Sequence, residues 1–550
     1  MLKSMQSLNH ATLKPVEKCV IFGIDGADFY LTRQLMDEGD LPNLKCLSQN
    51  GSYNSLLSTI PPLTPQAWSS FACGVNPGKH GIYDFGEVPL QTYEPVLNTS
   101  IDRQTRGFWD YLEESGFSAA IINMPLTFPA EIMRLDRSYM IGGMHTPSVK
   151  QLTQNPRVQE YILQKHPEVL IDVMSFWYQD MDYFVQQVFS MIEARTKMLL
   201  DLRREFPTDI LCNVWVGLDR VLHAFYAQQD FVTGGRGWKY EHVVRNVFRK
   251  IDESIGKILN EVGGSPTIII VSDHGFGELQ KDIYLNHYLL QLGYLKFDVD
   301  ALTDAMCKHP AWRGGYLTRK IYSFLCHFGF WQERVPPQQK CFEALDFERL
   351  KCFVAGLFGN VYIHRRDRFK HGWIEPNSEE YYSIRAELIQ DLLSLRDNGN
   401  RIVDEVFLAE ETYNGPFVWK APDLVLNMRD YSYISRGGQE FKRNMLWDEP
   451  GVNHSGNHRM EGILFCSGNK IAKNKKLKFP ARLEDIAPTL LHSVGLQIPY
   501  EMDGRVLTEL LDLENEPCFS HQDIYRQKAS LKVPLGDEQY QRLKKLGYLG

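Results

Sequence analysis

Two stretches of apolar sequence, each ending at acidic residues, indicate the fold class. Residues 19–26 read CVIFGIDG, and residues 267–275 read TIIIVSDHG. Continuous runs of Val, Ile and Phe are typical of strands that are buried on both faces of a sheet. The first run stops at Asp25 and the second at Asp273-His274. We therefore expect two buried strands with polar loops at their carboxyl ends.

Outward from these stretches, strand-like and helix-like patterns alternate along the chain. Further short apolar runs occupy residues 118–122, 210–216 and 462–466. Helical periodicity occurs between them, at residues 185–204 and 240–262. Strands that alternate with helices predict an α/β fold with a mostly parallel central sheet that is flanked by helices.

The pattern changes near residue 295, which predicts an inserted region. Residues 295–445 are aromatic and basic, and they show weaker strand–helix alternation. We expect residues 18–294 and 446–510 to form the core, with residues 295–445 inserted as a cap that shapes the substrate pocket. Residues 511–550 are predicted to be a C-terminal tail ending in a helix, because polar residues recur at helical spacing in residues 537–545.

The composition argues against several classes of protein. The chain has 550 residues, with 60 Lys plus Arg against 68 Asp plus Glu and a net charge of −8. Binding to a nucleic acid duplex needs a basic face, so we expect no such partner. No apolar run reaches the roughly 18–20 residues of a membrane-spanning helix, and we expect no membrane span. Residues 1–18 contain charged residues and no run of apolar residues long enough for a secretory signal, so we expect none there.

The ten cysteines are scattered and form no C-x-x-C pair. This spacing argues against a cysteine zinc site or a redox dithiol. Reduced thiols are typical of intracellular proteins, and we expect a cytoplasmic location.

Polar side chains at the predicted strand ends form a candidate metal site. They are Asp25, Asp219, His223, Asp273 and His274. Ligands of open α/β sheets bind at the carboxyl ends of the strands. The i, i+4 spacing of Asp219 and His223 places both on one helical face, which suits two ligands of one metal; a local Asp–His hydrogen bond is the alternative explanation of this pair. A lone aspartate after a strand can also be a helix N-cap.

A histidine cluster at residues 454–458 adds His458 as a sixth candidate ligand. Carboxylate oxygen and imidazole nitrogen together suit zinc or manganese, whereas all-oxygen sites suit magnesium and calcium. Six ligands are too many for one tetrahedral zinc ion, and they suit two ions that share a nucleophile.

The candidate nucleophile lies in residues 59–81, where Thr64, Ser69 and Ser70 carry hydroxyl groups. Prolines flank Thr64 closely, and the apolar residues beyond it predict a helix that starts just after Thr64. A nucleophile at a helix N-terminus gains donors for an anionic substrate. Thr64 could instead be a simple N-cap, and the two serines fit ordinary positions on the helix.

Together these motifs resemble the alkaline phosphatase superfamily, and most closely its type I phosphodiesterase/nucleotide pyrophosphatase branch. The motifs occur in the order of the family: Asp25-Gly26, Pro42-Asn43-Leu44, Thr64 ten residues before Gly74, His80-Gly81-Ile82, Asp219 with His223, Asp273-His274-Gly275, and Gly456-Asn457-His458. Residues 483–504 and 543–549 also look like this superfamily. The resemblance covers most of residues 18–510.

The resemblance implies an alkaline-phosphatase-like core with two divalent metal ions, zinc foremost and manganese as the alternative. It implies that Asp219, His223 and His458 hold one ion. Asp25, Asp273 and His274 would hold the other ion, which would also bind the oxygen of Thr64. The implied activity is hydrolysis of a phosphodiester or pyrophosphate bond through a phospho-threonine intermediate. The implied substrate is a small phosphate ester, with nucleotides among the candidates.

The chain departs from this branch at one position. Nucleotide pyrophosphatases carry an asparagine shortly after His-Gly-Ile that donates to the phosphoryl oxygen, and the aligned residue here is Phe85. Sulfatases need Cys or Ser in a C/S-x-P-x-R context, which the nucleophile loop lacks.

Two alternatives use the same residues. A phosphomonoesterase or phosphotransferase would need an extra cation near the nucleophile, for which Lys79 and Arg459 are the candidates. An inactive phosphate-binding protein would be expected to lose ligands, and all six are present.

Overall fold

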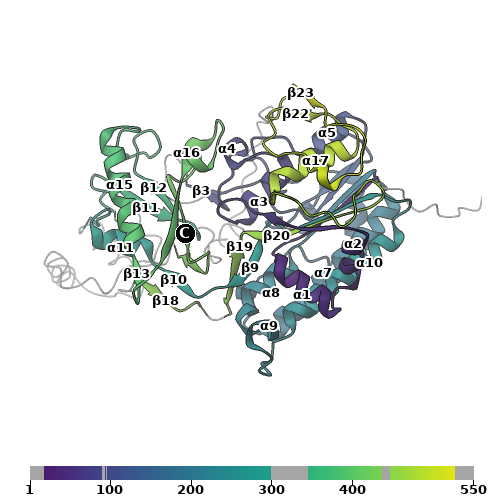
Figure 1. The fold of residues 1–550 in the computed structure, drawn as a ribbon, viewed down its shortest axis with the longest axis horizontal. Coiled ribbons are helices and arrows are strands. Elements are labelled where there is room, and N and C mark those ends of the chain that lie inside the picture. Colours follow the sequence, from purple (N-terminus) through teal and green to yellow (C-terminus); the bar gives the residue numbers. More distant parts are fainter. Residues whose placement is uncertain are drawn as a thin grey trace, which may run out of the picture.

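The computed structural model describes residues 18–88, 93, 96–298, 345–436, 446–451 and 453–526. The helical pattern predicted at residues 537–545, the motif at 543–549 and the interrupted apolar pattern of residues 1–17 lie outside these residues. Two lobes are visible in Figure 1, a large one around a central sheet and a smaller one that carries α15. Within the described part of the chain, no helix combines the length and the apolar character needed to cross a bilayer.

The large lobe is built on an eight-stranded, mostly parallel sheet with the order β21-β2-β20-β8-β1-β7-β5-β6. The apolar stretch at residue 19 forms its centre, because β1 pairs in parallel with β7 on one side and with β8 on the other. The strand β20 runs antiparallel to both of its neighbours. The strands are β1 (Cys19–Ile24), β2 (Gly51–Leu57), β5 (Ala119–Ile122), β6 (Tyr139–Ile141), β7 (Ile210–Trp215), β8 (Thr267–Val271), β20 (Glu461–Ser467) and β21 (Ala481–Arg482). The predicted α/β fold class is confirmed.

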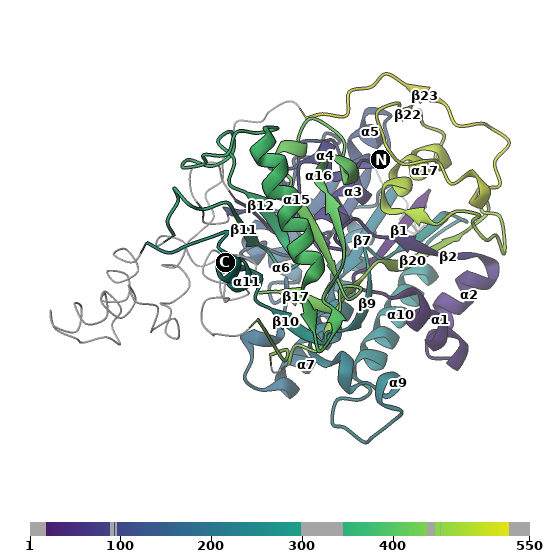
Figure 2. The ribbon, with the colours of Figure 1, turned by 60° about the vertical axis from the view of Figure 1, so that its left-hand side comes forward.

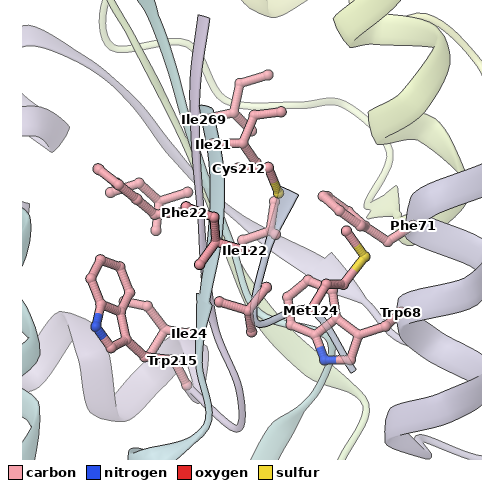
Figure 3. Packing of buried hydrophobic residues seen from close by; sticks show 14 of the residues in the cluster. Ile21, Phe22, Ile24, Trp68, Phe71, Ile122, Met124, Cys212, Trp215 and Ile269 are labelled. Carbon is pink, nitrogen blue, oxygen red and sulfur yellow. The ribbon is translucent and has the colours of Figure 1, made fainter. Parts of the chain in front are cut away.

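The strand β1 is covered by buried side chains on both faces of the sheet. In Figure 3, Phe22 and Ile24 lie beside Trp215 on one side, while Trp68 and Phe71 lie on the opposite side. All of these side chains are almost fully buried. Burial on both faces explains why the strand sequence is a continuous apolar run rather than an alternating one.

Helices cover the two faces of this sheet as separate layers (Figure 1). One layer holds α1 (Phe29–Glu38), α2 (Pro42–Asn50), α7 (Met181–Glu205), α8 (Gly217–Phe225), α9 (Asp230–Thr233) and α10 (Val243–Glu261). The other holds α3 (Thr64–Cys73), α4 (Pro77–His80), α5 (Phe108–Glu114) and α17 (Ile486–Ser493). The large lobe also includes α6 (Pro156–Lys165), β3 (Gly86–Glu87), β4 (Val96–Leu97), β22 (Ile498–Pro499) and β23 (Phe519–Ser520).

Local sequence signals set the ends of several of these helices. The carboxylate of Asp28 accepts the N–H groups of Tyr30 and Leu31 and caps α1. The helix α3 ends at Gly74, which takes a left-handed conformation with φ 67°. The N-cap alternative therefore does not apply to Asp25, because the cap of α1 is Asp28.

The smaller lobe has its own hydrophobic cluster around the antiparallel sheet β11-β12-β16-β15. Figure 2 brings this lobe forward and shows α15 beside its strands. The cluster includes Ile283, Leu285 and Leu289, so this core extends to residues before 295. Its elements are α11 (Leu285–Leu292), β11 (Cys352–Ala355), β12 (Asn360–Ile363), α15 (Glu379–Ser394), β13 (Arg396–Asp397), β14 (Asn400–Arg401), β15 (Val403–Leu408), α16 (Ala409–Thr412) and β16 (Leu424–Met428).

Two small sheets join the lobes. The first consists of β17 (Tyr433–Ser435), β10 (Lys281–Ile283) and β18 (Trp447–Asp448), and the second of β19 (Gly456–Arg459) and β9 (Gly275–Glu278). In Figure 1 the pair β9–β19 lies between the two lobes, next to β20. The strand β9 begins directly after Asp273-His274, so this junction lies at the carboxyl edge of the central sheet.

Candidate metal centre and nucleophile

The candidate ligands meet at the carboxyl edge of the central sheet. Asp25 directly follows β1, and Asp273 and His274 follow β8, its neighbour on one side. Asp219 and His223 lie on α8, which follows β7, the neighbour on the other side. His458 reaches the same place from β19. The parallel pairing of three adjacent strands therefore brings together residues that are far apart in sequence.

Three of these residues form a tight first set, Asp219, His223 and His458. The Nε2 atoms of His223 and His458 are 3.0 Å apart. The Oδ2 atom of Asp219 lies 3.3 Å from Nε2 of His223 and 3.4 Å from Nε2 of His458. One nitrogen or oxygen atom from each residue thus faces a common point.

Asp25, Asp273 and His274 form a second set next to the first. Nε2 of His274 lies 3.3 Å from Oδ2 of Asp273 and 3.6 Å from Oδ1 of Asp25. The rings of His274 and His458 stack with their centroids 3.5 Å apart, so the two sets adjoin. His274 is also within reach of the first set, because ligand atoms of Asp219, His274 and His458 all lie within 4.8 Å of one another.

Backbone carbonyl groups orient all three histidines. The carbonyl oxygens of Gly456, Gly275 and Pro62 lie 3.0, 3.0 and 2.7 Å from Nδ1 of His223, His274 and His458, respectively. A carbonyl oxygen only accepts, so each Nδ1 carries the proton and donates it. In the neutral imidazole, Nε2 then directs its lone pair toward the centre, which is the arrangement that metal-binding histidines use.

The buried carboxylates fit a pair of cations. Oδ1 of Asp25, Oδ2 of Asp219 and Oδ2 of Asp273 are buried without a hydrogen-bond donor. The other oxygen of each carboxylate accepts a bond, from Trp68 Nε1 at 3.1 Å, from Arg220 Nη1, and from the Gly26 N–H at 3.4 Å. Buried unpaired acceptors are costly, and divalent cations would satisfy them. The mixture of carboxylate oxygen and imidazole nitrogen suits zinc or manganese.

Burial controls the protonation of the cluster. It raises the pKa of Asp25 and Asp273 well above the usual range, with neighbouring carboxylates adding to the effect. Burial also opposes ionisation of Asp219, but His223 and Arg220 hold its pKa well below the usual value. Burial lowers the pKa of His274 and His458, so their imidazoles are neutral. Neutral imidazole is the form that binds a metal.

The buried side chain of Arg220 orients Asp219 of the first set. Nη1 of Arg220 donates to Oδ1 of Asp219, while Nε and Nη2 bond Asp172 at 2.9 and 3.0 Å. Arg220 is only 4% exposed. Asp172 shortly precedes Met174, Ser175, Phe176 and Tyr178, which line a cavity beside the centre. The sequence reading missed both residues, and the only local signal was that Arg220 directly follows Asp219.

Thr64 is the hydroxyl residue at the centre. Its Oγ1 lies 3.3 Å from Nε2 of His274, and the residue is buried at 3% exposure. The helix α3 begins at Thr64 itself, with Leu63 as N-cap, so the predicted start just after Thr64 and the N-cap alternative were both wrong. Ser69 instead donates to the carbonyl of Pro65, and the hydroxyl of Ser70 contacts His80. The hydroxyl groups of the two serines are therefore bonded to residues outside the ligand sets.

A cavity of about 350 Å³ opens beside the first set. His223 and His458 line it together with apolar and aromatic side chains, among them Met174, Tyr178 and Phe358. Arg436 and His454 add polar groups to its wall. Sequence reasoning noted His454 but missed Arg436, whose partners come from distant segments.

The remaining residues singled out from the sequence lie elsewhere. Phe85 is buried in an apolar cluster with Leu63 and Met144 and offers no donor. Lys79 bonds Asp503 at 2.6 Å, and Arg459 donates to several backbone carbonyls, including that of Glu278. Neither cation appears among the residues that line the cavity.

Comparison with known proteins agrees with this architecture. The structure is similar to phosphonoacetate hydrolase from Sinorhizobium meliloti 1021 in complex with phosphonoacetate, at 15% identity and a TM-score of 0.53 over 88% of this chain and 96% of that one. It is also similar to human ectonucleotide pyrophosphatase/phosphodiesterase 5, at 12% identity and a TM-score of 0.51 over 90% of this chain and 100% of that one. These likenesses support the fold.

Sequence comparison adds a short and a long match. A 2,3-bisphosphoglycerate-independent phosphoglycerate mutase from Clostridium tetani is 46% identical over 52 residues, which is 10% of each chain. The family model for type I phosphodiesterase/nucleotide pyrophosphatase matches residues 19–458. That span covers most of the chain and contains every candidate ligand, and the family predicted from the motifs is confirmed. The chain belongs to the type I phosphodiesterase/nucleotide pyrophosphatase family, a family of hydrolases.

Proposed function

We propose that the protein hydrolyses a phosphodiester or pyrophosphate bond in a small phosphate ester, with two divalent cations and with Thr64 as nucleophile. The observation that carries this proposal is the position of the Thr64 hydroxyl, 3.3 Å from Nε2 of His274 at the edge of two adjoining ligand sets. Family membership supports the same reaction class.

In this proposal, Asp219, His223 and His458 would hold one cation. Asp25, Asp273 and His274 would hold the other, together with the oxygen of Thr64. When bound, such cations lower the pKa of a hydroxyl group and neutralise charge on the attacking and departing oxygens. Zinc is the first choice and manganese the second, because the donors are a mixture of nitrogen and oxygen.

The Thr64 oxygen would attack phosphorus, and its proton would pass to the surrounding water. The bond between phosphorus and the leaving alcohol breaks, and its electron pair stays on the departing oxygen, which takes up a proton. Water then attacks the phospho-threonine and gives up a proton, the bond between phosphorus and the threonine oxygen breaks, and the threonine oxygen takes up a proton to restore the hydroxyl. The helix N-terminus at Thr64 favours the negative charge that develops beside it.

The diester reading is favoured over the monoester reading by the charged groups around the cavity. A monoester carries an additional negative charge. The two arginines that line the cavity already pair with carboxylates, Arg220 with Asp172 and Asp219, and Arg436 with Asp282. Lys79 and Arg459 are bonded to other partners. The names of the two similar structures refer to small phosphorus compounds, phosphonoacetate in one and nucleotides in the other. We propose a substrate of this size, with a nucleotide as the first compound to test.

The test is a substrate panel with metal-depleted and reconstituted protein. We expect 4-nitrophenyl diesters and a nucleoside pyrophosphate to be hydrolysed after zinc or manganese is restored, and much less before. The control is the matched 4-nitrophenyl monoester. Faster turnover of the monoester than of every diester would contradict the diester reading, and full activity without metal would contradict the whole proposal.

We also propose a cytoplasmic location. Every cysteine in the described residues is a free thiol, and buried examples such as Cys19 and Cys212 lie within strands of the central sheet. Free thiols are typical of a reducing compartment. Cell fractionation and thiol titration of the denatured protein should give a cytoplasmic protein with all ten cysteines reduced. Recovery outside the cell with disulfides would contradict this proposal.

A further inference from the structure

A chain of three polar side chains, Asp282, Arg436 and His454, lines the cavity beside the metal centre. Nε of Arg436 lies 2.8 Å from Oδ2 of Asp282. Nη2 of Arg436 lies 2.7 Å from Nδ1 of His454. Asp282 thus orients the guanidinium of Arg436, and this guanidinium orients the imidazole of His454. None of these three residues belongs to either ligand set.

The contact with Arg436 determines which nitrogen of His454 carries the proton. Arginine stays protonated in proteins and can only donate, so Nδ1 of His454 must accept. The imidazole is then neutral with its proton on Nε2. Among the described residues, none makes a hydrogen bond with this Nε2–H group. The Nε2–H group of His454 is therefore available as a hydrogen-bond donor at the wall of the cavity.

The backbone holds His454 in place next to the first ligand set. Its N–H donates to the carbonyl of Gly451 at 3.1 Å. The next residue, Ser455, donates its N–H to the carbonyl of His223 at 2.7 Å and accepts from the N–H of Leu279 at 2.9 Å. The rings of His454 and His223 have their centroids 5.5 Å apart. A donor held this firmly needs little reorganisation during a reaction.

The direction of the reaction relates His454 to the leaving group. In phosphoryl transfer the attacking and leaving oxygens are roughly in line on opposite sides of phosphorus. Thr64 contacts His274 of the second set, whereas His454 lies beside His223 of the first set. An oxygen that departs away from Thr64 would therefore move toward His454. Phe85 and Lys79 offer no alternative donor there, because one is apolar and the other bonds Asp503.

We propose that His454 donates a hydrogen bond from Nε2–H to the departing oxygen, with Arg436 and Asp282 as positioning residues. This inference rests on the proposed function. The proton remains on the imidazole throughout, since Nδ1 accepts from Arg436 and cannot supply another. His454 therefore stabilises charge on the departing oxygen without transferring a proton to it.

The test compares His454→Ala and His454→Gln with the wild type on methyl aryl phosphate diesters with 4-nitrophenyl, 4-chlorophenyl and phenyl leaving groups. A phenolate of high pKa needs the hydrogen bond most. We expect His454→Ala to lower kcat for the phenyl ester by about 100-fold, and for the 4-nitrophenyl ester by less than about 10-fold. His454→Gln keeps an N–H donor and should recover part of the loss. Arg436→Met should give the same dependence with a smaller loss.

Metal content and a surface variant separate this role from damage to the structure. Elemental analysis should find the same metal content in the His454 variants as in the wild type. His242→Ala, which removes a histidine whose side chain is 54% exposed, should leave kcat unchanged. An equal loss on all three esters, or no loss, would overturn the inference, as would a Gln variant no better than the Ala variant.

A binding measurement keeps this inference distinct from the proposed function. If the wild type with zinc or manganese hydrolysed none of the esters, the proposed function would fail. The donor would then be tested by ¹⁵N-histidine NMR of the zinc-loaded protein, with His454→Gln used to assign the signal. We expect the Nε2–H signal of His454 to shift when inorganic phosphate is added. An unshifted signal, or a proton found on Nδ1, would overturn the inference.

Discussion

Nδ1 of His458 donates to the carbonyl oxygen of Pro62 at 2.7 Å. Pro62 lies two residues before Thr64, so this bond ties a candidate ligand of the first set to the loop that carries the candidate nucleophile. A second bond, from the N–H of Ser58 to the carbonyl of Met460 at 2.9 Å, joins the same two segments. The positions of His458 and of the Thr64 hydroxyl therefore depend on each other.

Removal of the Thr64 hydroxyl should abolish most of the turnover. We expect Thr64→Ala to lower kcat for a diester by at least about 100-fold, in line with the loss of one strong transition-state contact. Thr64→Ser keeps the hydroxyl and should retain more activity. Ser69→Ala is the matched control, since the Ser69 hydroxyl donates to the carbonyl of Pro65, which is outside the ligand sets. Near-normal turnover by Thr64→Ala together with an inactive Ser69→Ala would show that the nucleophile is misassigned.

Chelation should lower both activity and thermal stability. The three carboxylate oxygens that lack donors in the buried centre are stabilised when cations bind the folded chain. Zinc at 100 times its dissociation constant would add about 2.7 kcal/mol per site to the free energy of unfolding. Elemental analysis and melting curves before and after chelation measure this, with about two ions expected per chain. One ion or fewer, with full activity after chelation, would argue against the dinuclear site.

Loss of Arg220 should weaken metal binding at the first set. Arg220 bonds both Asp219 and Asp172, so Arg220→Met leaves the ligand without its orienting donor. We expect the zinc affinity to fall about 10- to 100-fold, measured by competition with a chelating dye. Asp172→Asn should give a smaller effect, because Asp172 acts through Arg220. Arg204→Met is the control, since its side chain is 55% exposed. An unchanged zinc affinity in a folded Arg220→Met protein would refute this role.

Asp84 should make stability depend on pH. Burial raises the pKa of Asp84 to about 7, although bonds from the Phe85 N–H and from Asn360 oppose the shift. The pKa in the unfolded chain is about 3.9, so the folded state binds more protons between these values. The stability that Asp84 contributes is fully present below about pH 4 and is lost as the pH rises through about 7.

Substitution of Asp84 by asparagine tests this dependence. The side chain of Asp84→Asn cannot ionise. In the wild type, Oδ1 of Asn360 is buried without a hydrogen-bond partner. If the side-chain amide of Asn360 rotates, this atom can accept a hydrogen bond from the new amide at position 84. The variant should therefore gain stability relative to the wild type as the pH is raised from about 4 to about 8, by at most ~4 kcal/mol. Urea unfolding at several pH values measures the difference. A difference that stays constant with pH would mean that Asp84 ionises normally.

Much of the centre could be predicted from the sequence for a simple physical reason. The apolar runs at residues 19 and 267 form adjacent parallel strands, and parallel strands end at the same edge of a sheet. Polar residues directly after such runs, such as Asp25 and Asp273, must then lie close together. The i, i+4 spacing of Asp219 and His223 likewise places both on one face of α8. The motif order then identified the family, which the family comparison confirmed.

Contacts between distant segments, by contrast, were decided only by the tertiary structure. Arg220 meets Asp172 from 48 residues away, and His458 meets Pro62 from 396 residues away. The pairing of Arg436 with Asp282 and His454 also joins separate segments of the chain. No periodicity or local spacing marks such pairs, because they depend on how loops pack after the sheet has formed. The sequence by itself determined which residues reach the sheet edge, and tertiary packing decided how each is oriented there, since hydrogen-bond partners are chosen by distance in space.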